Sequence, residues 1–109
     1  MDSARLTSLI VAASFFLGMN AFADTDKKTE RTWKAKCAAC HGATGKGDTD
    51  KGKALKIEDM TTAAFQAKSN DVLKKSTLDG FKPDMPAFKG ELSPEQADAL
   101  VAYMRTFKK

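Results

Sequence analysis

The sequence has 109 residues, 18 Lys and Arg against 14 Asp and Glu, a formal net charge of +4, two Cys and one His. This length makes a single domain and excludes a second hydrophobic core. The positive charge favours contact with an anionic molecule without saying which. Residues 1–23 hold 15 of the hydrophobic residues, so the rest of the chain has only 17 large apolar side chains. Such a thin core predicts that a staple, a metal or a cofactor helps to fill the interior.

Residues 1–23 have the order of a secretory signal peptide. A short polar start that carries Arg5 precedes an uncharged apolar run from Leu6 to Met19. Ala21-Phe22-Ala23 then places small residues at both positions of a cleavage site. We expect cleavage before Asp24.

Cleavage would leave an exported domain of residues 24–109. The alternative is an uncleaved membrane anchor, because the apolar segment reaches the short limit of a transmembrane helix. Export predicts a periplasmic protein without stable membrane insertion, and it argues against nucleic acid as a partner despite the basic charge.

The first part of this domain predicts helix, then loop. A helical pattern begins around Thr29 and runs into Cys37. Residues 42–53 hold four Gly and five charges, which is typical of a loop. Residues 55–66 are short and mixed, and they predict one or two helical turns.

Two further helices follow. Residues 70–78 predict a helix with Asn70 as N-cap and Gly80 just past its end. Residues 81–91 carry two Pro and predict an irregular loop. Ser93 and Gln96 then form a capping box, and apolar residues recur at helical spacing up to Phe107. No segment alternates with period two, so the domain is predicted to be all-α.

Cys37-Ala38-Ala39-Cys40-His41 contains every Cys and the only His of the chain. This C-x-x-C-H string is the attachment signal of c-type haem, in which two thiols meet the two vinyl groups and the His binds iron. A thioredoxin-type disulfide would need a βαβ setting, and a zinc site would need a fourth ligand. We therefore predict one covalently attached haem c.

With these residues, the sequence resembles the class I c-type cytochromes. The resemblance also includes Trp33, four residues before the first Cys, the glycines up to Gly47, and a Met-Pro loop at Met85-Pro86. It implies a cytochrome c fold, with three to five short helices wrapped around one covalently bound haem. It also implies that the first and last helices cross, with Trp33, Leu100 and Tyr103 in contact. Thr29 stands where the family often has Gly at this crossing.

The sixth iron ligand has three candidates after cleavage, namely Met60, Met85 and Met104. Met104 lies on the apolar stripe of the last helix, which predicts a core position. Met85 lies in a loop stiffened by Pro83 and Pro86, and the family's Met ligand falls at this Met-Pro position too. We expect His41 and Met85 as axial ligands, with Met60 as the alternative and an open site as a third possibility.

Iron bound by His and Met has no free position, so these residues predict an electron carrier and not an enzyme. We expect a monomeric domain that docks transiently with redox-partner proteins. The alternatives are a haem-based sensor with an open sixth position and a small subunit of an oxidoreductase complex.

Overall fold

The computed structural model describes the backbone of residues 19–109 and the side chains from residue 27 onward. This part of the chain contains six helices and no strand, only an isolated bridge between Phe81 and Met85. The helices are α1 (Met19–Lys36), α2 (Ala38–His41), α3 (Asp50–Ala54), α4 (Ala63–Gln66), α5 (Asn70–Asp79) and α6 (Pro94–Arg105). The predicted all-α class is confirmed. The helices outnumber the expected three to five because α2 and α4 are single turns.

The apolar run of the predicted signal peptide lies outside the described residues except for its last residue, Met19, and the cleavage position stays a prediction. In the part of the chain that is described, no helix is both long and apolar enough to cross a membrane.

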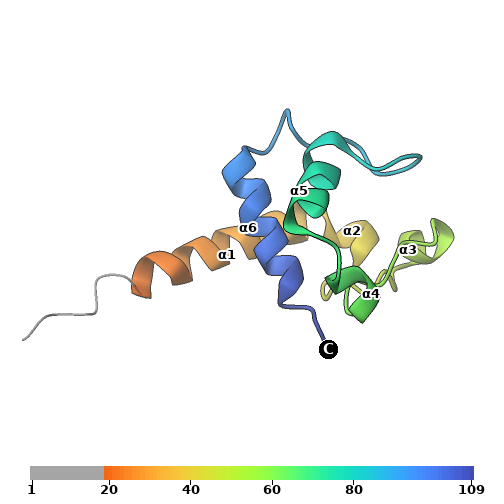
Figure 1. Cartoon of the computed structure of the whole chain (residues 1–109), viewed down its shortest axis with the longest axis horizontal. Coiled ribbons are helices and arrows are strands. Elements are labelled where there is room, and N and C mark those ends of the chain that lie inside the picture. Colours follow the sequence, from red (N-terminus) through yellow and green to blue (C-terminus); the bar gives the residue numbers. More distant parts are fainter. Residues whose placement is uncertain (1–18) are drawn as a thin grey trace, which may run out of the picture.

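Helices α1 and α6 cross, and α5 lies beside α6 (Figure 1). Trp33 on α1 and Leu100 on α6 are the two largest fully buried side chains of the described part. The ring centroids of Trp33 and Tyr103 lie 5.7 Å apart, so the predicted contact is confirmed. Thr29 is buried in α1. Helix α1 begins ten residues before the predicted start.

Helix α3 lies inside the segment predicted as a loop, so that prediction was wrong for residues 50–53. The Thr49 hydroxyl accepts a hydrogen bond from Gly52 N at 2.9 Å and donates one to Cys40 O at 2.8 Å. The N-cap thus starts the helix and ties it to the Cys40 turn. Gly52 is buried there, because its missing side chain lets α3 approach Cys40.

The predicted N-cap of α5 was wrong by one residue. Ser69 is the N-cap, and its hydroxyl accepts a hydrogen bond from Val72 N at 3.1 Å. Asn70 Oδ1 instead accepts hydrogen bonds from the Arg105 guanidinium. Gly80 ends the helix with φ of 84°, as expected of a glycine at this place.

The capping box of α6 is confirmed. Gln96 N donates to Ser93 Oγ at 3.1 Å, and Ser93 N donates to Gln96 Oε1 at 2.8 Å. The buried face of α6 consists of Ala97, Leu100, Val101 and Met104. These residues follow the helical spacing of the sequence.

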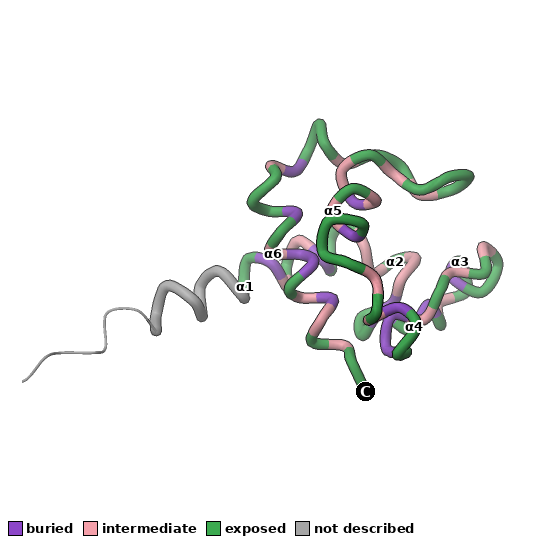
Figure 2. Tube along the Cα trace, viewed as in Figure 1, coloured by how far each residue is buried: buried purple, intermediate pink, exposed green. Residues whose placement is uncertain are grey.

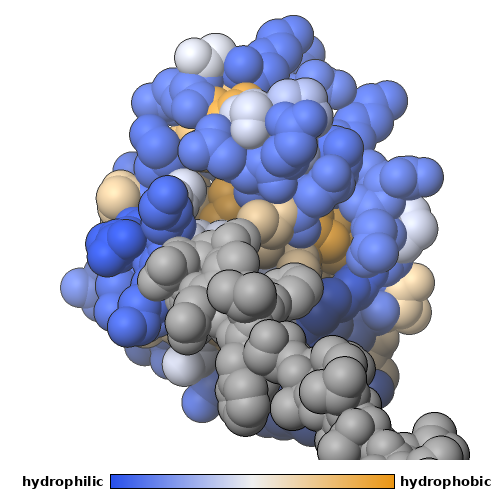
Figure 3. All heavy atoms as spheres, turned by 90° about the vertical axis from the view of Figure 1, so that its left-hand side faces the viewer, coloured by the Kyte–Doolittle hydropathy of each residue, from blue (hydrophilic) through white to orange (hydrophobic). Residues whose placement is uncertain are grey.

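Burial is concentrated where the helices meet, and the loops are largely exposed (Figure 2). The described hydrophobic cluster has eight buried members: Trp33, Met60, Phe65, Leu73, Leu92, Leu100, Val101 and Met104. Figure 3 shows a face covered mainly by hydrophilic side chains, with the most hydrophobic atoms visible in recesses between them. The core is small, as the sequence predicts.

Candidate functional site

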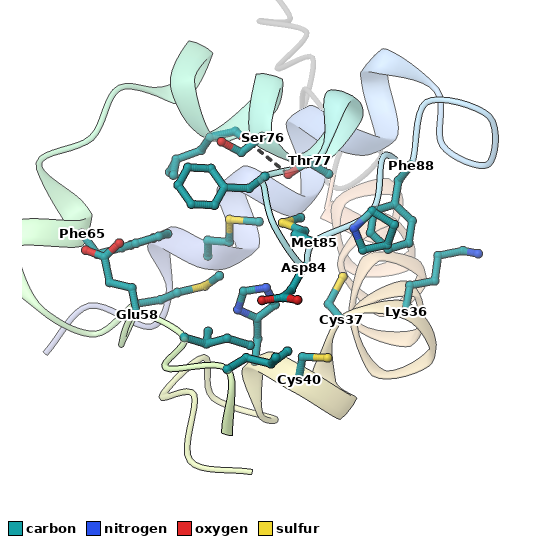
Figure 4. A pocket seen from close by; sticks show the side chains of 18 of the residues that line it. Lys36, Cys37, Cys40, Glu58, Phe65, Ser76, Thr77, Asp84, Met85 and Phe88 are labelled. Atoms are coloured by element: carbon teal, nitrogen blue, oxygen red, sulfur yellow. Dashed lines mark hydrogen bonds between the residues drawn. The ribbon is translucent and has the colours of Figure 1, made fainter. Parts of the chain in front are cut away.

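The four predicted site residues line one cavity. Its volume is about 340 Å³, which lies in the usual range of cofactor and ligand sites. Cys37, Cys40 and His41 contribute from α1–α2, and Met85 contributes from the loop after α5. Figure 4 shows Cys37, Cys40 and Met85 around this space, coming from different elements. Residues 44 positions apart in sequence are thus brought together.

The two Cys lie on a continuous helical path. Cys37 N donates to Trp33 O at 2.8 Å, and His41 N donates to Cys37 O at 2.9 Å. Both thiols are half-buried and free. Burial raises the pKa of the Cys37 thiol to about 11, which keeps it protonated at neutral pH.

His41 Nδ1 is buried and has no hydrogen-bond partner in the described part of the chain. Burial lowers the pKa of His41, so its ring is neutral and keeps a lone pair on one nitrogen. The His41 ring lies 5.8 Å from the Trp33 ring, centroid to centroid. A neutral, half-buried imidazole beside a cavity is suited to bind a metal within it.

Met85 is held by the backbone of its loop. Phe81 N donates to Met85 O at 3.0 Å, and Met85 N donates to Phe81 O at 2.9 Å. Gly80 allows this close turn, since a Cβ there would lie 2.7 Å from Met85 O. Pro83 and Pro86 also border the cavity and fix the backbone on either side. The loop is irregular apart from the Phe81–Met85 bridge, as predicted.

The other two Met also line the cavity. Met60 and Met104 are each 5% exposed. Met104 belongs to the core, as predicted, but the sequence reasoning missed its second role as part of the cavity wall. Met60 also lines the cavity, so it remains the alternative ligand.

Sequence reasoning also missed the wall contributed by α5. Val72 and Ser76 are spaced by four, as are Leu73 and Thr77, and all four line the cavity. This i, i+4 pattern was the signal that could have found them. Phe65 of α4 and Phe88 of the loop between α5 and α6 complete an apolar wall.

The charge at the cavity is mixed. Of its lysines, Lys36 pairs with Glu91 at 3.1 Å and Lys68 pairs with Glu58 at 2.6 Å. Lys56 and Lys82 lie there too. Two of the four lysines at the cavity are thus paired with glutamates, so the positive charge of the whole chain is not concentrated at this site.

Two large hydrophobic side chains border the cavity and face solvent. Val72 is 52% exposed and Phe81 is 64% exposed. Burial of exposed apolar surface is a common source of affinity between proteins. The cavity thus opens next to apolar surface that a partner could cover.

The residues fit a haem. The wall is mostly apolar, a neutral imidazole and a thioether sulfur can bind iron, and two free thiols lie near the same space. The zinc alternative lacks ligands, since residues 27–109 bring no three His, Cys, Asp or Glu side chains together around one point.

Comparisons with known proteins agree with this chemistry. Residues 18–104 match the family model described as cytochrome C oxidase, cbb3-type, subunit III. The chain is 33% identical over 95 residues to cytochrome c6 from Nostoc sp. strain PCC 7120, covering 87% of this chain and 82% of that protein. The solved structure of KustC0563 c-type cytochrome has 33% sequence identity and a TM-score of 0.70, over 74% of this chain and 98% of that one.

These relatives share the all-α fold, and their family implies haem c as the cofactor. Members of this kind carry electrons and are not enzymes, as the sequence predicts. The chain belongs to the cytochrome c family and is a small c-type cytochrome of electron transfer.

Proposed function

We propose that the mature chain, residues 24–109, is a periplasmic carrier of single electrons that holds one covalently attached haem between His41 and Met85. The bound haem supplies an iron that alternates between Fe(III) and Fe(II). The observation that carries the proposal is that Cys37, Cys40, His41 and Met85 line one cavity. The residue chemistry of this set suits covalent attachment through the two thiols and iron binding by His41 and Met85.

Each residue has a separate task in this proposal. The thiols of Cys37 and Cys40 would each add across a vinyl group, with sulfur on one carbon and hydrogen on the other. His41 would give the lone pair of its neutral ring. Met85 would give a weak thioether bond that favours reduced iron and raises the potential. The Phe81–Met85 backbone bonds fix the backbone that carries this side chain, which would lower the entropic cost of binding.

We propose that a redox partner docks transiently over Val72 and Phe81. Their exposed side chains would be buried on docking, and the nearby Lys56 and Lys82 would steer an acidic partner. Two exposed apolar side chains suit a short-lived complex between monomers more than a permanent one, which buries a much larger apolar surface.

The test is optical spectroscopy of protein expressed with export to the periplasm. The oxidised protein should show the far-red Fe(III)–S(Met) band, and Met85→Ala should abolish it. Met60→Leu is the matched control and should keep the band. Loss of the band in Met60→Leu, together with retention in Met85→Ala, would assign Met60 instead. Rapid CO binding to the reduced wild-type protein would favour the open-site sensor.

Export has its own test. The intact mass of the periplasmic protein should correspond to a chain that starts at Asp24 plus one haem. An uncleaved chain in the membrane fraction would support the anchor alternative.

A second function, a small subunit of an oxidoreductase complex, is favoured by the family model, whose description names a subunit of an oxidase. Affinity purification from native membranes separates the two possibilities. A free carrier should elute as a monomer on size exclusion, whereas a subunit should co-elute with haem-containing partners.

A further inference from the structure

The side chain of Gln66 joins two walls of the cavity. Its Nε2 donates hydrogen bonds to Met60 O at 2.7 Å and to Met104 O at 3.1 Å. Met60 precedes α4 and Met104 lies on α6, and both buried side chains line the cavity. Because a carboxamide nitrogen carries two hydrogens, it can make both bonds at once. One half-buried amide therefore fixes the backbone behind two methionine side chains.

Arg105 fixes which way that amide points. Its Nη1 donates to Gln66 O at 3.0 Å and lies 3.4 Å from Gln66 Oε1. A guanidinium only donates and a backbone carbonyl only accepts, so Oε1 faces Arg105 and Nε2 faces Met60 O and Met104 O. In the opposite orientation Nε2 would face the Arg105 donor. Oε1 would then face two other acceptors, Met60 O and Met104 O.

Arg105 is held in turn by the segment that joins α4 to α5. Its Nη2 donates to Lys68 O at 2.6 Å and to Asn70 Oδ1 at 2.8 Å, and its Nε donates to Asn70 Oδ1 at 3.2 Å. Together with the bond to Gln66 O, the bond to Lys68 O satisfies backbone carbonyls at and just after the end of α4, where no further helical turn can do so. The planar fork of donors engages several acceptors at once, which a lysine ammonium does not reproduce.

We propose that Gln66, oriented by Arg105, is a positioning residue for the bound haem, and sets how closely Met60 and Met104 pack against it. This inference rests on the proposed function, since it assumes that haem fills the cavity. Release of the two carbonyls would let this wall relax and admit water. A wetter haem pocket favours the more charged ferric state, so the reduction potential should fall.

The experiment measures the reduction potential of three holoprotein variants by titration against the wild type. Gln66→Leu removes the donors without adding charge, and Gln66→Glu replaces the donor by an acceptor of the same shape. Gln96→Glu is the matched control. It adds the same charge at an exposed position in the first turn of α6, where the Gln96 side chain accepts a hydrogen bond from Ser93 N.

We expect Gln66→Leu and Gln66→Glu to lower the equilibrium constant for haem reduction by about three- to tenfold. A tenfold change corresponds to about 59 mV in the potential for one electron. Gln96→Glu should change it less than twofold, and all three should keep the far-red band. A shift in Gln66→Glu without one in Gln66→Leu would assign the effect to charge and overturn the proposal.

Arg105→Lys keeps the positive charge but loses the fork, and it provides the test if Gln66→Leu does not accumulate in folded form. It should shift the potential in the same direction. An unchanged potential in Arg105→Lys and in every folded Gln66 variant would overturn the positioning role. A wild-type protein without a haem spectrum would contradict the proposed function instead, so the two failures are distinguishable.

Discussion

Trp33 Nε1 donates a hydrogen bond to Gly42 O at 3.0 Å, across nine residues of sequence. This bond joins α1 to the residue that directly follows His41. The Trp33 ring is fully buried, and it also packs against the rings of Tyr103 and Phe107. One side chain thus connects the crossing of α1 and α6 to the residues expected to hold the iron.

Trp33→Phe should therefore destabilise the protein by about 2–4 kcal/mol, because it leaves a buried carbonyl unpaired and opens a small cavity. Urea unfolding followed by circular dichroism measures this loss. Tyr103→Phe is a matched control in the same cluster, since it removes only a hydroxyl from a half-buried ring. It should change stability by less than about 0.5 kcal/mol. Equal losses in both variants would contradict the importance of the Trp33–Gly42 bond.

The features that local sequence rules govern were the ones that could be predicted. The capping box at Ser93 follows from spacing and side-chain chemistry, whereas the Trp33 contact with α6 was expected from the resemblance to the class I c-type cytochromes. Helix α3 was missed because glycine content favours a loop. Gly52 is present for a tertiary reason, its contact with Cys40, which no local pattern reveals.

The candidate site shows the same division. The C-x-x-C-H string and the Met-Pro pair at Met85 are short motifs, and both can be recognised from the sequence alone. The bridge from Gln66 to Met60 and Met104 spans up to 38 residues of sequence. A lone glutamine carries no sign of such partners, since nothing in a polar side chain's own neighbours tells which distant carbonyls it will meet.

Gly52 gives a test in which the usual helix rule is reversed. Alanine normally stabilises a helix interior by up to about 1 kcal/mol over glycine. Here a Cβ would lie 2.5 Å from Cys40 O and 2.6 Å from Gly47 O, both of which are backbone atoms. Gly52→Ala should therefore lower the free energy of unfolding by about 2–4 kcal/mol. The yield of holoprotein should fall as well.

Gly90→Ala is the control for this substitution, because a Cβ at Gly90 would meet nothing within 4 Å. Its free energy of unfolding, measured by thermal unfolding of the holoprotein, should stay within about 0.5 kcal/mol of the wild-type value. A stabilised Gly52→Ala variant would mean that α3 can move away from Cys40 without cost.

Covalent attachment can be tested by removing the thiols. The double variant Cys37→Ser/Cys40→Ser should still bind some haem through His41 and Met85, but acid–acetone extraction should remove it completely. The wild type should keep its haem through the same extraction, and each single variant should keep it through one thioether bond. Extraction of haem from the wild type would contradict attachment at these residues.

Asp59 makes stability depend on pH. Its Oδ1 accepts hydrogen bonds from the Thr61 hydroxyl at 2.6 Å and from Thr61 N at 2.8 Å, and these bonds hold the pKa of Asp59 below its usual value of 3.8. Because this pKa is lower in the folded than in the unfolded chain, the stabilisation is present above pH 3.8 and is lost as the pH falls through the folded value. Asp59→Asn should therefore be less stable than the wild type at neutral pH.

That difference should shrink as the pH falls through the acid range, since protonation removes the charge of Asp59 in the wild type as well. Urea midpoints of both proteins at neutral and acidic pH measure it. Thr61→Val removes one of the two donors and should reduce the pH dependence without abolishing it, because the backbone N–H still donates. A difference between Asp59→Asn and the wild type that stayed constant with pH would show that the charge of this carboxylate plays no part, and that Asn and Asp differ here only in their hydrogen bonding.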